Sequence, residues 1–168
     1  MFGKIDVTGI IKAHFATLKS YGSGRYRPID IALFTLVPAV FTFAFIYRGA
    51  SITPAAATMM IFAASILTLL SSTLLYLVYR ISSELDYRTR GQIKRQFIRE
   101  INDNIFYTML TSIISCILIF LSLLTTRAGL KALVDSIAFF CAASFILSLL
   151  MVLNRTHVLV RKTSSEED

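Results

Sequence analysis

Charged residues are scarce in this chain: they make up 16% of its 168 residues, whereas apolar residues make up 55%. Soluble domains are about a quarter charged, so the chain has too few polar side chains to cover a water-facing surface. The mean hydropathy of +0.69 agrees. This shortage excludes a soluble globular domain, a disordered tail, a collagen-like fibre and a disulfide-rich secreted module. It indicates an integral membrane protein.

Residues that carry chemistry are equally few. The two cysteines, Cys116 and Cys141, lie within apolar runs, which argues against a disulfide framework or a redox motif. The two histidines, His14 and His157, are isolated, and we expect both at the surface. No HExxH, no GxSxG and no paired intramembrane aspartates occur. We therefore expect no enzyme, no metal site and no cofactor.

Known families of small four-helix membrane proteins are excluded by residues that the chain lacks. Small multidrug transporters have a glutamate in their first span, disulfide-forming quinone reductases have two exposed cysteine pairs, and four-helix haem proteins have facing intramembrane histidines. The segment Gly22-Ser23-Gly24 matches part of a phosphate-binding loop, but it is not followed by Lys-Ser/Thr. We read this segment as a hinge, with nucleotide binding as the weaker alternative.

Four charge-free runs predict membrane crossings, since a spanning helix needs about 20 apolar residues. We predict an all-α polytopic membrane protein with four transmembrane helices in an antiparallel bundle. Pro28 and Pro54 favour helix starts, and Pro38 should kink the first span. The short connection 125–129 makes the last two helices antiparallel neighbours. The predicted spans are about 29–48, 53–79, 104–126 and 131–153.

Lysine and arginine are distributed unevenly over the connecting segments. Only Arg48, Arg127 and Lys131, of the 17 Lys and Arg, lie on one side of the predicted spans. Because basic loops stay in the cytoplasm, we predict that both termini and the middle loop are cytoplasmic. We expect a multi-pass protein of the bacterial inner membrane, and no cleavable signal is visible.

Residues 5–20 are expected to form an amphipathic helix on the cytoplasmic leaflet, within an interfacial segment, 1–28. Apolar residues recur there at helical spacing, and the lysines fall mainly away from them. The stripe consists of Val7, Ile11, His14 or Phe15, and Leu18.

A cytosolic helical hairpin is expected over 80–103, with its turn at Gly91. Apolar residues recur every four positions along its second arm, so the third long helix should begin near Gln92. We expect residues 155–168 to form a cytoplasmic tail with a disordered acidic end. The periodic residues are Ile93, Phe97, Ile101 and Ile105.

Five basic residues form a cluster on this hairpin. We read them as a topology signal that contacts anionic lipid headgroups. The alternative is a docking face for a nucleotide or an acidic protein. No aromatic platform interleaves these charges, which argues against nucleic acid. The cluster consists of Arg88, Arg90, Lys94, Arg95 and Arg99.

Apart from Asp30 at the start of the first predicted span, Asp135 is the only acidic residue within a predicted span. Lys131 lies one helical turn before it, so the two can pair near a helix N-terminus at the membrane interface. The alternative is that Asp135 lines a pore mouth or binds a proton or cation.

Small and hydroxylic residues recur at spacings of four along the spans. Such pairs let helix backbones approach closely, either within one bundle or between copies of the chain. A bundle of four short helices has little room for a conduit, so a pore between copies of a homo-oligomer is the easier arrangement. The candidate packing residues are Ala64, Thr68, Ser72, Ser112, Cys116, Ala138 and Ala142.

These features predict a small oligomeric membrane effector or sensor that forms gated pores or perturbs the bilayer. By analogy of class, such proteins serve in anti-phage defence. The alternative is a membrane anchor or scaffold that recruits a cytosolic partner through the basic cluster. A small transporter ranks third.

Overall fold

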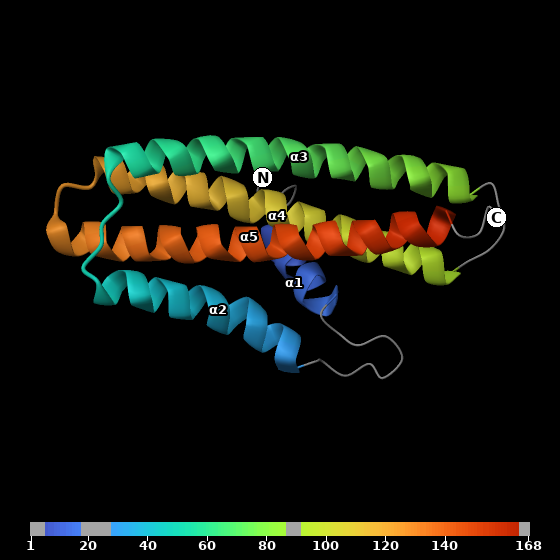
Figure 1. Cartoon of the computed structure of the whole chain (residues 1–168), viewed down its shortest axis with the longest axis horizontal. Helices are drawn as coiled ribbons and strands as arrows, with labels where there is room; N and C mark the ends of the chain where they lie inside the picture. The colour runs from blue at the N-terminus through green and yellow to red at the C-terminus, as the bar shows by residue number, and fades with distance from the viewer. Residues whose placement is uncertain (1–5, 18–27, 87–91, 165–168) are drawn as a thin grey trace.

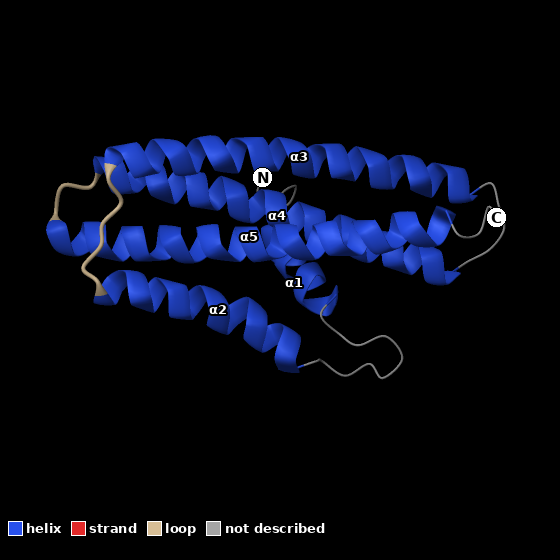
Figure 2. Cartoon of the chain, in the orientation of Figure 1, coloured by secondary structure: helices blue, strands red, loops and turns tan. Residues whose placement is uncertain are grey.

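The computed structural model describes residues 6–17, 28–86 and 92–164, with side chains over 6–17, 32–80 and 98–158. The described chain is all-helical (Figures 1 and 2), as predicted. Its helices are α1 (Val7–Thr17), α2 (Pro28–Tyr47), α3 (Pro54–Asp86), α4 (Gln92–Leu124) and α5 (Ala128–Ser164).

The end of α2 is a Schellman motif centred on Gly49, whose φ is +60°. The N–H of Gly49 donates to the carbonyl of Ile46 at 2.9 Å, and the N–H of Ala50 donates to the carbonyl of Phe45 at 3.2 Å. Glycine suits this position because it adopts a left-handed conformation without a Cβ penalty. The motif stops α2 and turns the chain toward α3.

The start of α3 is set by a proline and a cap. Proline favours the first helical position, and α3 begins at Pro54 as predicted. The hydroxyl oxygen of Thr53 accepts the backbone N–H of Ala56 at 3.2 Å, which satisfies one free donor of the first turn. The connection between α4 and α5, residues 125–127, is short, as predicted.

Three of the described helices are long and apolar enough to cross a membrane: Pro54–Arg80, Ile98–Leu124 and Ala128–Val158. At 1.5 Å per residue, even the shorter ones extend about 40 Å, which exceeds a hydrocarbon core of about 30 Å. The described apolar part of α2, Ala32–Tyr47, is shorter. The structure thus supports a membrane protein, and a fourth crossing by α2 is part of the proposal below.

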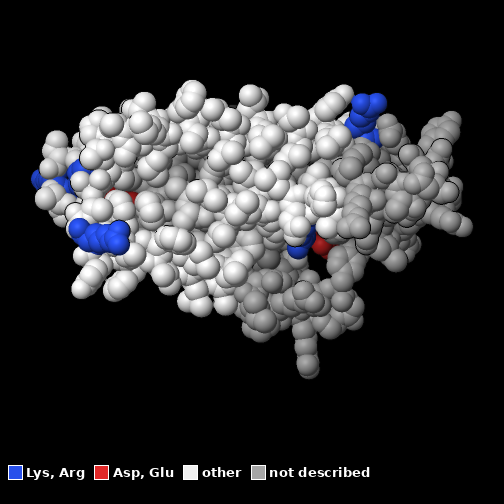
Figure 3. Space-filling view, viewed as in Figure 1, with Lys and Arg blue, Asp and Glu red and all other residues white. Residues whose placement is uncertain are grey.

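The outer surface of the long helices is apolar. On the face shown in Figure 3, described charges appear at the left end, at the upper right and on the lower edge right of the centre, and most of the surface between them shows no described charge. Soluble proteins rarely expose apolar surface of this extent, whereas a bilayer covers it with hydrocarbon. Exposed apolar residues include Leu36, Phe43, Phe62, Leu69, Ile117, Phe120, Leu133 and Leu150.

The interior between these helices contains many hydroxyl groups. Several of them donate to the carbonyl four residues earlier in the same helix, as Thr108 does to Asn104 at 2.7 Å and Ser148 does to Ser144 at 2.9 Å. Small hydroxylic residues let helices approach closely without unsatisfied donors. The buried members are Ser71, Thr108, Thr111, Ser112, Ser115, Ser122, Ser144, Ser148 and Thr156.

The helix at the centre of the fold is α4. It packs against α3, α5 and α1, whereas the main contact of α2 is with α5. Figure 1 shows that each long helix runs opposite to the one before it, and that α1 lies across them. The short N-terminal helix therefore meets the side of α4 rather than extending a bundle.

Two buried apolar clusters hold the long helices together near opposite ends. One joins α3, α4 and α5 and contains the predicted stripe residues Ile101 and Ile105, both fully buried. Its members are Val78, Ile98, Ile101, Ile105 and Val152. The other lies near the connections that follow α2 and α4, and its members are Ile52, Ala57, Ile119 and Ala138.

The arms of the predicted hairpin are helical up to its turn. The predicted helix start near Gln92 is confirmed, and α3 continues to Asp86. The predicted turn residue, Gly91, lies outside the described residues. At the C-terminus α5 continues to Ser164, well beyond the predicted end of the last span, because no Gly or Pro interrupts the chain after Gly129.

Candidate functional site

A buried histidine joins α1 to α4. Nδ1 of His14 lies 2.8 Å from Oδ1 of Asn104, and their exposed fractions are 1% and 0%. An amide oxygen only accepts hydrogen bonds, so Nδ1 carries the proton in this contact. The neutral ring then has its lone pair at Nε2.

Three aromatic rings surround the His14 imidazole. The ring of Tyr107 stacks on it with centroids 3.8 Å apart and planes 4° apart. Phe15 and Phe34 approach in edge-on geometry, with centroids 5.4 and 5.7 Å away. The imidazole therefore lies among rings from α1, α2 and α4, which removes it from water.

The C-terminal end of α1 is also held by polar contacts. The hydroxyl of Thr17 donates to the carbonyl of His14 at 2.7 Å and lies 2.9 Å from Oδ1 of Asn104. Arg155 of α5 donates to the carbonyl of Thr17 at 3.0 Å, and it pairs with Glu100 of α4 at 3.3 Å. A cation at the C-terminal end of a helix also stabilises the helix dipole.

We define the His14 cluster as His14, Thr17, Asn104, Tyr107 and Arg155. The surroundings lower the pKa of His14 from 6.5 to about 4. Burial has the largest effect and lowers the pKa, the bond to Asn104 raises it, and the positive charge of Arg155 lowers it. His14 is thus neutral at pH 7. In addition, Nδ2 of Asn104 is buried without a hydrogen-bond partner among the residues that the structure describes, which costs about 1–3 kcal/mol.

The expectation that both histidines are at the surface is wrong for His14, whereas His157 is exposed as expected. His14 is buried because α1 packs against α4 with the face that carries Ile10, His14 and Thr17. The position of His14 on the apolar stripe was the available signal in the sequence. Its partner, Asn104, lies 90 residues away and shows no local signal.

A second polar cluster, the Asp135 cluster, lies near the opposite ends of the helices and consists of Asp135, Lys131, Ser122 and Ile52. The expected pair is present, with Nζ of Lys131 3.3 Å from the carboxylate. The carboxylate also accepts the N–H of Ile52 at 3.0 Å and the hydroxyl of Ser122. Lys131 in turn donates to Ser122 at 3.0 Å. Asp135 is 1% exposed and well bonded, which fits a structural role.

The predicted packing residues lie mainly at contacts within one chain. The hydroxyls of Thr68 and Ser112 lie 2.6 Å apart and join α3 to α4. Ala64, Ser112 and Ala138 are buried, whereas Ser72, Cys116 and Ala142 are partly exposed.

Pro38 lies inside α2 and is buried. Its missing N–H leaves one carbonyl of that helix without its usual partner.

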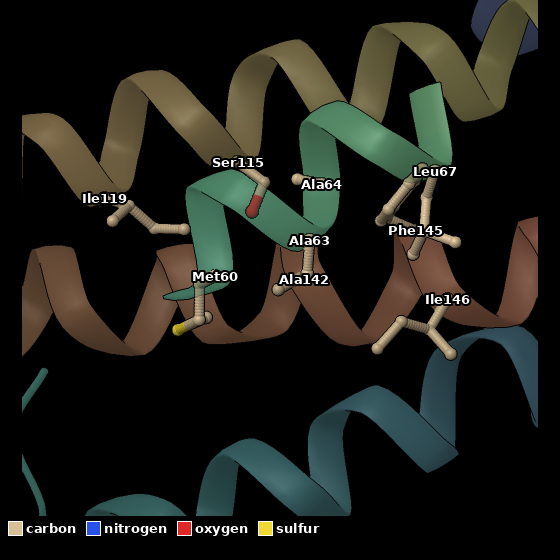
Figure 4. Close-up of a pocket in the computed structure, with 9 residues that line it drawn as sticks. All are labelled: Met60, Ala63, Ala64, Leu67, Ser115, Ile119, Ala142, Phe145 and Ile146. Carbon is tan, nitrogen blue, oxygen red and sulfur yellow. The ribbon is translucent and has the colours of Figure 1, made fainter. Parts of the chain in front are cut away.

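A small apolar cavity of about 120 Å³ lies between α3, α4 and α5 (Figure 4). Alanines leave this space: Ala63 and Ala64 come from α3 and Ala142 from α5, while Ser115 lies on α4. The cavity is open on one side, where its lining residues Ala63 and Ile146 are exposed. It offers no polar group beyond a hydroxyl for recognition of a charged substrate.

Most side chains of the predicted basic cluster lie outside the part of the chain that the structure describes. Arg88 and Arg90 lie outside the described residues, and the side chains of Lys94 and Arg95 on α4 are not described either. Arg99 is described and exposed.

Among the described residues, no group of three or more His, Cys, Asp or Glu side chains is placed to hold a metal ion. No protein family, curated protein or solved structure matches the chain. The His14 cluster is the candidate site, because it joins a short helix to two long helices through a buried titratable group.

Proposed function

We propose that the protein is a self-associating membrane effector that forms gated pores or perturbs the bilayer, and that docking of α1 keeps it inactive. The observation that carries this proposal is the His14 cluster. A helix of 11 residues is attached to α4 and α5 by a few polar contacts, one of which includes an unpartnered buried amide. The unpartnered amide lowers the free-energy cost of releasing α1, because release returns this amide to water.

The proposed topology has four crossings, with α2 as the fourth and both chain ends in the cytoplasm. The described apolar part of α2 lies against α5, beside helices that are long enough to span. The sparse basic residues Arg48, Arg127 and Lys131 would then face outward, in agreement with the positive-inside rule. The bacterial inner membrane and a role in defence rest on analogy of class alone.

A pore would form between copies rather than through one chain. Among the described residues, several interior hydroxyls donate to carbonyls of their own helix, and the cavity between α3, α4 and α5 is small and apolar, which favours a pore between copies. Small residues on the exposed side of α3 support close approach of a second copy. They are Ala55, Thr58, Ala63, Ser65 and Thr73.

The second candidate is a membrane anchor or scaffold. The extension of α3 to Asp86 and the start of α4 at Gln92, beyond the apolar spans, favour it, as does the exposed Arg99. Its partners would be anionic lipids and a cytosolic acidic protein or nucleotide. A small transporter ranks last, because Asp135 already bonds to Lys131, Ser122 and Ile52.

Leakage of entrapped dye from phospholipid vesicles tests the proposal. The full chain is reconstituted at increasing protein-to-lipid ratios as the wild type, as Asn104→Ala, which weakens α1 docking, and as Asn102→Ala, a matched control on the same helix. We expect leakage from Asn104→Ala to rise more steeply than linearly with protein density, because several copies must meet. Tight vesicles at every density, with α1 shown to be released, would reject the pore and favour the scaffold.

A further inference from the structure

The contact between α1 and α4 buries the imidazole of His14, a group that becomes positively charged in mildly acidic water. Histidine is the side chain whose ordinary titration falls between pH 5 and 8. We propose that uptake of a proton by His14 releases α1 from α4, so that this contact is acid-sensitive. Its role as a control element rests on the proposed function, whereas the release itself is measurable without it.

The geometry explains why the docked form resists the proton. Nδ1 already carries a hydrogen toward Oδ1 of Asn104, so a second proton must be added at Nε2. The product is an imidazolium with 1% of its surface exposed, among the rings of Tyr107, Phe15 and Phe34. A buried charge without a carboxylate partner is unfavourable. Release of α1 returns the ring to water.

The charged and titratable groups around His14 provide no bonded anion for an imidazolium among the described residues. From α5, Arg155 repels the imidazolium, and its guanidinium is already paired with Glu100 of α4. Tyr107 of α4 contributes a neutral phenol ring. Asp103, the neighbour of Asn104 on α4, makes no hydrogen bond to His14 in the described part of the chain, where the ring bonds to Asn104 instead. From α2 comes Phe34, which does not titrate. No described carboxylate bonds to the imidazole.

The direction and size of the effect follow from linkage. Above pH 6.5, neither the docked nor the released form holds the second proton, so docking has its full strength. As the pH falls from 6.5 toward about 4, the released form binds the proton and the docked form does not, so docking weakens. Between pH 7.5 and pH 5 the docking equilibrium should fall about 30-fold.

Hydrogen exchange of the α1 amides measures this equilibrium in the full chain in phospholipid vesicles. Protection factors, corrected for the intrinsic exchange rate at each pH, should fall about 30-fold for α1 between pH 7.5 and pH 5. The variant His157→Gln removes the other, exposed histidine and should show the same fall. The variant His14→Gln should lose most of it. Unchanged α1 protection in the wild type, or an equal fall in His14→Gln, would overturn the proposal.

A second measurement does not depend on how His14→Gln folds. Carbon NMR of labelled histidine side chains follows both rings through a pH titration, and His157→Gln assigns them. The docked His14 ring should titrate far below 6.5, and a midpoint near 6.5 would overturn the proposal. If α1 protection falls while vesicles stay tight at pH 5, proton-driven release stands and the pore function fails. If dye leakage grows with protein density while the protection of α1 does not change with pH, the pore function is supported and proton-driven release of α1 is rejected.

Discussion

Oδ2 of Asp135 accepts the backbone N–H of Ile52 at 3.0 Å, which joins the connection between α2 and α3 to the first turns of α5. The same carboxylate binds Lys131 on its own helix and the hydroxyl of Ser122 near the end of α4. One buried anion therefore ties together the α2–α3 connection, the end of α4 and the start of α5 at one end of the molecule. This arrangement gives Asp135 a structural explanation that needs no ion or substrate.

The Asp135 cluster should contribute measurably to stability. We expect Asp135→Asn to lower the free energy of unfolding in detergent by about 1–3 kcal/mol, because bonds to a charged acceptor are lost. Lys131→Met should cost about as much or more, since it leaves a buried carboxylate without its cation. In a double-mutant cycle, the double variant should lose less stability than the sum of the losses in the two single variants. A variant Asp135→Asn with full stability and abolished leakage activity would instead make Asp135 a functional site.

The cavity between α3, α4 and α5 predicts opposite effects for two alanines on α5. Ala142 lines the cavity, so Ala142→Leu should fill it and stabilise the chain by about 0.5–1.5 kcal/mol. Ala138 is fully buried one turn earlier, in contact with the cluster that contains Ile52 and Ile119. Ala138→Leu should therefore cost about 1–3 kcal/mol through overpacking. Thermal unfolding in detergent measures both, and equal effects would contradict the assigned cavity.

The bond from His14 to Asn104 should control how firmly α1 is docked. Asn104→Ala leaves the His14 donor buried without an acceptor, so α1 protection from hydrogen exchange at pH 7.5 should fall about 5- to 30-fold, or about 1–2 kcal/mol. The matched variant Asn102→Ala should leave α1 protection close to that of the wild type. Equal losses in the two variants would mean that Asn104 acts through α4 as a whole and not through α1.

The proposed topology predicts which introduced cysteines are reached from outside intact cells. In a background without Cys116 and Cys141, Gly129→Cys should react with an impermeant thiol reagent, whereas Gly91→Cys should not. Gly129 tolerates the change because a Cβ there meets no atom within 4 Å. Reaction at Gly91→Cys alone would show that the topology is the inverse of the proposed one. Reaction at both positions would contradict the proposed alternation of crossings.

Much of the helical structure was predictable because it is encoded locally. Charge-free runs marked the long helices, Pro54 marked the start of α3, and a four-residue period placed the start of α4 near Gln92. The pair of Lys131 and Asp135 was predictable for the same reason, since one helical turn separates them.

The candidate site was not predictable, because its residues meet only through tertiary packing. Nothing near His14 in the sequence points to Asn104 or Arg155, which lie on two other helices. The bonds from Asp135 to Ile52 and Ser122 depend on packing in the same way. The cavity at Ala142 depends on how closely three helices approach, which composition alone does not determine.

Reversible attachment of α1 to α4 tests whether docked α1 keeps the effector inactive. The pair Thr17→Cys and Asn104→Cys, in a background without Cys116 and Cys141, places thiols at side chains that approach each other in the docked form. A short reducible bis-methanethiosulfonate linker then holds α1 in place in reconstituted vesicles. We predict tight vesicles while the linker is intact and rapid dye leakage after reduction. Equal leakage before and after reduction would contradict the account.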